Sequence, residues 1–185
     1  MNGSDPLRVS PGGVRLRATT PADAGALLAM KRQLDEETSF MLIERDERRE
    51  ELDEVRSALR RVGDTTNSTV IVAATGDVVL GYVEATGGGY RRNRFTAYVV
   101  IGVLAAASGH GIGSQLLAEL ERWAVNAGVH RLELTVMAHN HRAIRLYERA
   151  GFLVEGCRCE CLSVDGELVD ELYMAKLLPA AVTPL

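Results

Sequence analysis

The sequence has no long apolar run, no dominant charge of one sign and few aromatic residues. None of its apolar stretches approaches the about 20 residues that a membrane-spanning helix requires. Residues 1–13 lack the apolar core of a secretory signal, so we expect a cytoplasmic protein with no membrane partner. The formal net charge is only −4, which offers no basic surface for nucleic acid, so we expect no nucleic-acid partner.

Cysteine is also scarce, because the chain contains only Cys157, Cys159 and Cys161. On a regular strand alternate side chains share one face, so the three thiols would point the same way while remaining separated. No His-x-His or second cysteine pair accompanies them to complete a tetrahedral metal site. We therefore predict packed or half-buried thiols and no metal, while a metal or redox role stays open.

The composition is that of one globular domain. Of the 185 residues, 46% are hydrophobic and 25% charged, which suits a single substantial core. We expect a disordered leader over residues 1–13, one domain over 14–178 and a tail over 179–185.

Hydrophobic periodicity and turn residues predict alternating strands and helices along this domain. The expected strands cover 14–18, 69–74, 78–85, 96–103, 131–136, 153–162 and 168–177, and the expected helices start at 21, 47, 111 and 140. The second helix is expected over 47–62. This order predicts an α/β (α+β) fold with one mixed sheet flanked by about four helices.

A glycine-rich loop between the strand at 96–103 and the following helix is the main functional signal. Gly109, Gly111, Gly113 and Ser114 lie where the first-turn amides of a helix have no intrahelical partners. Those amides and the positive end of the helix dipole suit a phosphate, and glycine allows it to approach the backbone. The loop therefore predicts a phosphate-binding site.

The segment Ser108-Gly109-His110-Gly111-Ile112-Gly113 resembles the Arg/Gln-x-x-Gly-x-Gly/Ala signature of the GCN5-related N-acetyltransferase (GNAT) superfamily. The resemblance extends over about residues 14–178 and is similar to bacterial members acting on amino acids or small amines; further matches include Asn140, Leu146-Tyr147-Glu148 and Gly151-Phe152. It implies a mostly antiparallel, twisted sheet whose fourth and fifth strands splay apart. Between them the pantetheine arm of acetyl-CoA would bind, without any metal.

The resemblance also implies roles for individual residues. The coenzyme would be held by Ile101, Val103, Leu104, Ser108, Gly109, His110, Gly111, Gly113, Ser114, Asn140 and Tyr147, with the amide of Val103 or Leu104 polarising the acetyl carbonyl. Tyr147 would protonate the leaving thiolate, although its spacing also suits a core aromatic residue. Asn140 serves equally as a helix cap, and His110 as a solvated loop residue.

Two residues depart from the family pattern. Ser108 replaces Arg or Gln, and Tyr98 stands where relatives often carry an acidic general base. Glu84 is the nearest candidate for a substitute base; it equally suits a structural residue on a solvent-facing edge, and a water chain could carry the proton away instead. The acceptor pocket is expected from residues 36–41, 87–94 and the last hairpin. Its candidate residues are Glu37, Phe40, Arg94 and Tyr98.

We therefore expect an acetyl-CoA-dependent N-acetyltransferase acting on a primary amine of an amino acid, a polyamine-like molecule or a peptide, and a possible homodimer. The alternative is a non-catalytic acyl-CoA-binding or sensory module. A dinucleotide enzyme is excluded, because its glycine fingerprint follows a first parallel strand, whereas this loop comes after an antiparallel hairpin.

Overall fold

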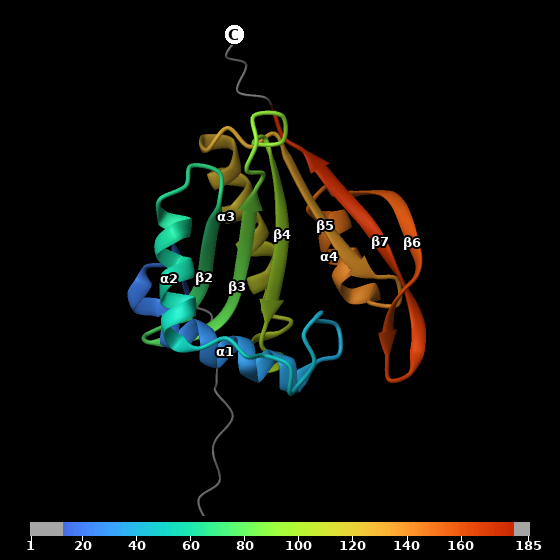
Figure 1. Ribbon diagram of the computed structural model, residues 1–185, viewed down its shortest axis with the longest axis horizontal. Coiled ribbons are helices and arrows are strands. Elements are labelled where there is room, and N and C mark those ends of the chain that lie inside the picture. The colour runs from blue at the N-terminus through green and yellow to red at the C-terminus, as the bar shows by residue number, and fades with distance from the viewer. Residues whose placement is uncertain (1–12, 180–185) are drawn as a thin grey trace, which may run out of the picture.

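The computed structural model describes residues 13–179 and contains a seven-stranded sheet with four α-helices (Figure 1). The strands are β1 (Arg15–Ala18), β2 (Thr69–Thr75), β3 (Val78–Gly87), β4 (Thr96–Val103), β5 (Arg131–Met137), β6 (Leu153–Val164) and β7 (Glu167–Leu177). The helices are α1 (Ala24–Glu37), α2 (Leu52–Gly63), α3 (Ile112–Asn126) and α4 (His141–Arg149), with 3-10 turns η1 (Pro21–Asp23) and η2 (Ala105–Ala107). The expected leader and tail lie almost entirely outside the described residues.

The strands follow the order β1-β2-β3-β4-β5-β7-β6 across the sheet. Every neighbouring pair is antiparallel except β4 and β5, which are parallel. A mixed, mostly antiparallel sheet with four flanking helices is what the sequence predicted, and the prediction is confirmed. Within the described residues, no helix is both long and apolar enough to cross a membrane.

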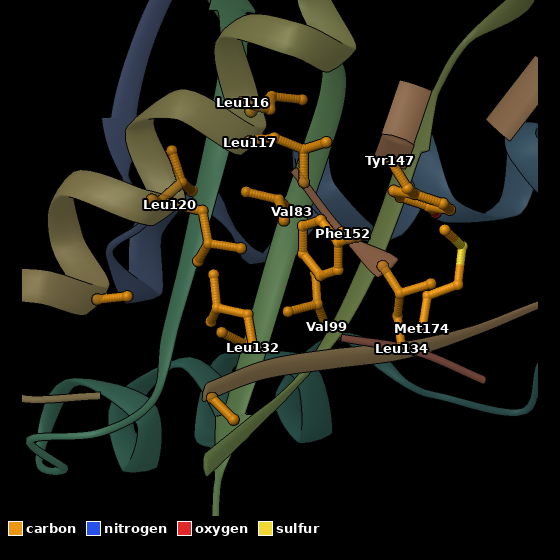
Figure 2. Close-up of a cluster of buried hydrophobic side chains, with 14 of the residues drawn as sticks. Val83, Val99, Leu116, Leu117, Leu120, Leu132, Leu134, Tyr147, Phe152 and Met174 are labelled. Carbon is orange, nitrogen blue, oxygen red and sulfur yellow. The ribbon is translucent and has the colours of Figure 1, made fainter. Parts of the chain in front are cut away.

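Helices cover both faces of the sheet, with α1 and α2 in front and α3 and α4 behind (Figure 1). Alternate residues of β2 divide between the two cores: Val70 and Val72 pack under α1 and α2, whereas Ile71 and Ala73 belong to the cluster under α3. In that second cluster Leu116, Leu117 and Leu120 of α3 pack on the sheet (Figure 2). Burial on both sides explains why the central strands read as continuous apolar runs.

The second helix begins later than the sequence predicted, at Leu52 and not at residue 47. Glu51 and Glu54 form a capping box that starts the helix there. Before it, the guanidinium of Arg48 donates to both carboxylate oxygens of the buried Asp35, including one bond of 3.0 Å. This ion pair fixes residues 47–51 against α1, so the charged run that resembled a first helical turn forms part of the connection.

The three cysteines do not share one face, contrary to the sequence prediction. The ladder between β6 and β7 is irregular between Arg158 and Leu162. Cys157 contacts Asp170, whereas Cys161 contacts Glu171, and these neighbouring residues of β7 point to opposite faces. Cys157 and Cys159 are also exposed, so the prediction of packed or half-buried thiols is wrong for two of the three.

Candidate active site

The strands β4 and β5 pair only at their beginning and then diverge (Figure 1). The last pair is Tyr98 with Glu133, although β4 continues to Val103 and β5 to Met137. We call the space between the two unpaired segments the fork. The sequence predicted this splayed pair, and the structure confirms it.

Main-chain donors of β4 point into the fork. The amide of Leu104 donates to the carbonyl of Leu80 at 3.0 Å, so it faces β3. Because successive amides of an antiparallel strand alternate in direction, those of Ile101 and Val103 face away from β3, toward β5. Of the two amides expected to polarise the acetyl carbonyl, Leu104 is thus already engaged, which leaves Val103.

The glycine loop follows β4 after the short 3-10 turn η2. Gly109 and Gly111 have φ angles of 84° and 79°, in the left-handed region that favours glycine. Gly111 is the N-cap of α3 and has no side-chain cap, so the first amides of this 15-residue helix are exposed to a ligand. A Cβ on Gly109 would meet no atom within 4 Å, which leaves the loop surface open. This geometry leaves room for a phosphate, so the phosphate-binding site stays a prediction that the loop conformation allows.

Two flanking residues have local partners. His110 lies on the surface with Nδ1 at 3.1 Å from the carbonyl oxygen of Ser108, so its ring turns back on the loop. At the start of α4, the side chain of Asn140 accepts a hydrogen bond from the amide of Ala143 at 3.1 Å. Asn140 is therefore a helix cap, which leaves its side-chain NH2 for another acceptor.

Glu37 has a role that the sequence did not indicate. One of its carboxylate oxygens accepts the amide of Ala105, the first residue of η2, at 2.7 Å. The other accepts the side-chain amide of Gln33 at 2.7 Å. Both oxygens are engaged, so Glu37 links the end of α1 to the segment that leads into the glycine loop. We do not place it in the acceptor site.

Tyr147 approaches the fork from the α4 side of the sheet. Its side chain is buried, with 7% of its surface exposed, and its ring packs on Phe152 at 5.9 Å between centroids. Figure 2 shows it at the edge of the core cluster, near Leu134 and Met174. Burial raises the pKa of Tyr147, and the nearby Tyr98 raises it further. The phenol thus keeps its proton at neutral pH.

Tyr98 lies on the opposite face of the sheet, at the base of the fork. Its hydroxyl is 2.8 Å from the hydroxyl of Thr135 on β5, so a hydrogen bond links the two strands just past their last backbone pair. The ring is 40% exposed on the side of α1 and α2. The two tyrosines therefore lie on opposite faces of the sheet, close to the point where β4 and β5 diverge.

The candidate base Glu84 is held by a residue that the sequence analysis missed. Lys31 of α1 lies 3.1 Å from the carboxylate of Glu84, with its ammonium group 5.0 Å from the ring centroid of Tyr82. Lys31 follows Leu27 by four residues and precedes Leu34 by three, so its helical spacing placed it on the buried face of α1. That spacing was the available signal.

A cleft of about 280 Å³ lies on the α1 side, near the open end of the fork. It is formed by the connection between α1 and α2, by Met137 at the end of β5 and by the β6–β7 hairpin. Phe40 of the same connection packs against His139, which follows β5, with the ring centroids 5.2 Å apart and the rings tilted by 48°. Two of the three segments expected to form the acceptor pocket therefore come together here.

The third segment does not. The turn between β3 and β4 lies at the opposite end of the sheet, where β4 begins (Figure 1). Arg94 stacks on the neighbouring Phe95 ring at 4.7 Å, and Asn67 donates to its carbonyl. The structure does not bring Arg94 to this cleft, because the fork opens toward the other end of the sheet. Arg45, which the sequence analysis did not select, lines the cleft instead.

The comparisons with known proteins agree with this geometry. A family model described as "Acetyltransferase (GNAT) family" matches residues 30–152. The L-amino acid N-acetyltransferase AaaT of Escherichia coli is 30% identical over 118 residues, covering 63% of this chain and 73% of that protein. A GNAT acetyltransferase structure from Streptococcus pneumoniae is 28% identical with a TM-score of 0.86, covering 89% of this chain and 99% of its own.

A phosphinothricin acetyltransferase from Sinorhizobium meliloti, solved in complex with AcCoA, shares the fold. Its TM-score is 0.80 at 20% identity, with 93% of this chain and 92% of that chain covered. The divergent strands, the glycine loop and the match over residues 30–152 lead to one conclusion. The chain belongs to the GNAT family and is an acetyl-CoA-dependent N-acetyltransferase.

Proposed function

We propose that this enzyme acetylates the amine of a small amino acid and that acetyl-CoA binds in the fork between β4 and β5. The observation that carries the proposal is the fork itself, since it places unpaired main-chain donors between a phosphate-binding loop and a buried tyrosine. Acetyl-CoA supplies a thioester whose carbonyl carbon an amine can attack. The residues of this chain would bind it and assist the transfer.

The coenzyme would be held mostly by main-chain groups. The amides of Ile101 and Val103 would meet its pantetheine arm as a neighbouring strand would. Gly109 to Ser114 would hold the pyrophosphate at the start of α3, where exposed amides and the helix dipole favour an anion. Ser108 and His110 would flank that site, and the NH2 of Asn140 would donate to the arm.

Two groups would act on the reacting atoms. The Val103 amide would donate to the carbonyl oxygen as negative charge develops on it. Tyr147 would donate its proton to the departing sulfur. The phenol is protonated at neutral pH and so has a proton to give, while burial raises its pKa and makes it a weaker acid than an exposed tyrosine.

The proton of the attacking amine would leave through water and not directly to Glu84. The ammonium group of Lys31 lies 3.1 Å from the Glu84 carboxylate and forms an ion pair with it. Glu84 would have to lose this ion pair before it could accept a proton. Tyr98, which replaces the acidic residue of relatives, is 40% exposed at the base of the fork and can join a chain of water molecules through its hydroxyl.

The acceptor would occupy the cleft under the α1–α2 connection. A volume of about 280 Å³ suits a molecule of amino-acid size. Arg45 lines it and, among the described residues, has no ion-pair partner, so its guanidinium is available for a carboxylate. Phe40, beside His139, would cover the mouth. The E. coli relative that acts on L-amino acids supports the same class.

The test is a coenzyme-A release assay with single amino acids, polyamines and short peptides. We expect the highest kcat/KM with an amino acid, and the Arg45→Ala variant should raise its KM about 10–100-fold, the loss of a charge-assisted hydrogen bond. Arg49→Ala, in the same connection but outside the cleft lining, is the matched control and should leave KM unchanged. Preference for a polyamine, or equal effects of both variants, would overturn the assignment. A large fall in kcat for Glu84→Gln would make Glu84 the base.

We further propose that the enzyme works in the cytoplasm as a homodimer. β6 is one of the two edge strands of the sheet, and the exposed apolar residues Leu153, Val154 and Leu177 lie on β6 and the neighbouring β7. Pairing with a second copy would cover them. Light scattering of the eluted protein distinguishes a dimer from a monomer.

A further inference from the structure

The β6–β7 hairpin contains a bulge that gathers polar groups outside the proposed acetyl-transfer site. Between the pairs Arg158–Glu171 and Leu162–Val169, three residues of β6 lie opposite the single residue Asp170 of β7. Glu160, in the middle of the three, has a φ of 49°, a left-handed conformation that is uncommon outside glycine. Its amide donates to one carboxylate oxygen of Asp170 at 2.8 Å, which stabilises the bulge.

The bulge brings two thiols and a carboxylate together. The Sγ atoms of Cys157 and Cys159 are 4.0 Å apart, and the Cys157 Sγ is 3.7 Å from the Asp170 carboxylate. All three ligand atoms lie within 4.8 Å of one another. In a tetrahedral zinc site with ordinary bond lengths, two sulfur ligands are about 3.8 Å apart, and a sulfur and an oxygen ligand are about 3.6 Å apart. Two of the three distances in the cluster are therefore close to those of such a site, and the third lies within 4.8 Å.

We propose that Cys157, Cys159 and Asp170 bind a thiophilic divalent cation of the zinc class, with water as the fourth ligand. Two thiolates and a carboxylate carry three negative charges, which favour a divalent cation. Thiolate ligands select zinc-like ions over magnesium or calcium, which prefer oxygen. Both cysteines are exposed, so an ion can reach them from solvent. Each thiol loses its proton on binding, so one ion releases two protons.

The third cysteine provides an internal control. The Sγ of Cys161 lies 3.6 Å from the carboxylate of Glu171 and 3.9 Å from the carbonyl oxygen of Val169. The Glu171 carboxylate also forms an ion pair with Arg158 at 2.7 Å. This ion pair lies on the face of the hairpin opposite to Asp170. Cys161 is two residues from Cys159 in the sequence but is not part of the cluster.

The experiment is a titration of the reduced, metal-free full chain with Co²⁺ under anaerobic conditions, followed by displacement with Zn²⁺. We expect one cobalt per chain, thiolate-to-cobalt charge-transfer absorption and release of two protons. Cys157→Ser and Cys159→Ser should each raise the dissociation constant by at least about 100-fold, more than loss of an outer-shell partner does. Asp170→Asn keeps the acceptor for the Glu160 amide and should weaken binding without disturbing the bulge. Cys161→Ser should bind like the wild type.

Several results would overturn the proposal. The absence of charge-transfer absorption in the reduced wild type is one. Another is an equal loss of affinity in Cys161→Ser and Cys157→Ser, which would indicate unspecific thiol binding. If the reduced chain binds no metal but Cys157 and Cys159 form a disulfide with an added oxidant, the cluster is a redox pair instead. Because the readout needs no acetyl-CoA or amine, failure here is separate from failure of the proposed acetyl transfer.

Discussion

The two edges of β5 differ in how far the sheet uses their backbone groups. Toward β7, all seven residues of β5 have partners, from Leu177 to Glu171. Toward β4, only Arg131, Leu132 and Glu133 do. The edge of β5 toward β7 has all its backbone groups paired and builds the fold. The edge toward β4 keeps unpaired donors and acceptors, which a ligand could use. Under the proposed function, the coenzyme site is made by omitting strand pairing, and the glycine loop would extend that site to the start of α3.

The largest effect should come from blocking the phosphate end of the open edge. Gly111 before α3 and Gly128 after it have φ angles of 79° and 71°, so glutamate at either position incurs similar backbone strain of about 1–2 kcal/mol. In Gly111→Glu a carboxylate would also occupy the place of the pyrophosphate. Loss of two or more charge-assisted hydrogen bonds, at about 1.5–3 kcal/mol each, should raise the acetyl-CoA dissociation constant about 1,000-fold.

Isothermal titration calorimetry measures that constant, with Gly128→Glu as the matched control. The control should lose a similar amount of stability and keep its affinity, because no atom of the glycine loop surrounds it. If both variants bind acetyl-CoA equally, the phosphate site is not at the start of α3.

A smaller effect should follow from removing the proposed proton donor beside the fork. Tyr147→Phe keeps the ring packed on Phe152 but deletes the hydroxyl, so kcat should fall about 100-fold, as for loss of a general acid. The dissociation constant of acetyl-CoA should change little. Tyr82→Phe removes a second buried hydroxyl, under α1 and α2, and should leave kcat unaltered. Stopped-flow and steady-state kinetics of both variants measure kcat and acetyl-CoA affinity separately. If Tyr147→Phe lost kcat and affinity in parallel, the acid role would be contradicted.

The smallest effect concerns the side-chain link that crosses the fork. Tyr98→Phe and Thr135→Val each break the 2.8 Å hydrogen bond between the strands. A double-mutant cycle by urea unfolding should give a coupling free energy of about 1 kcal/mol, the usual net contribution of one hydrogen bond. Zero coupling would mean that the strands separate directly after their last backbone pair.

The sequence predicted those parts of the molecule that depend on local chemistry. The apolar runs of the central strands and the period of α3 located the sheet and its rear layer, because burial imposes these patterns directly. The loop at Gly109 and Gly111 was recognisable because positive φ angles before a helix call for glycine.

The parts that it could not predict depend on which segments meet in three dimensions. Arg94 was assigned to the acceptor because its turn is basic, but strand direction puts that turn at the wrong end of the sheet. The Lys31–Glu84 pair joins residues 53 positions apart, and no local pattern links them. The bulge at Glu160 breaks the alternation assumed for the cysteines, and the sequence contains no glycine there to signal it.

The contact between Glu37 and Ala105 limits how the acceptor preference of this enzyme can be engineered. The connection after α1 helps to line the cleft and is an obvious segment to exchange between family members. Yet Glu37, the residue that ends α1, also supports η2, just upstream of the glycine loop. A chimera whose junction lies before Glu37 would replace both the Glu37–Ala105 hydrogen bond and the connection that lines the cleft. A chimera joined after it would exchange the substrate preference alone and leave coenzyme affinity intact.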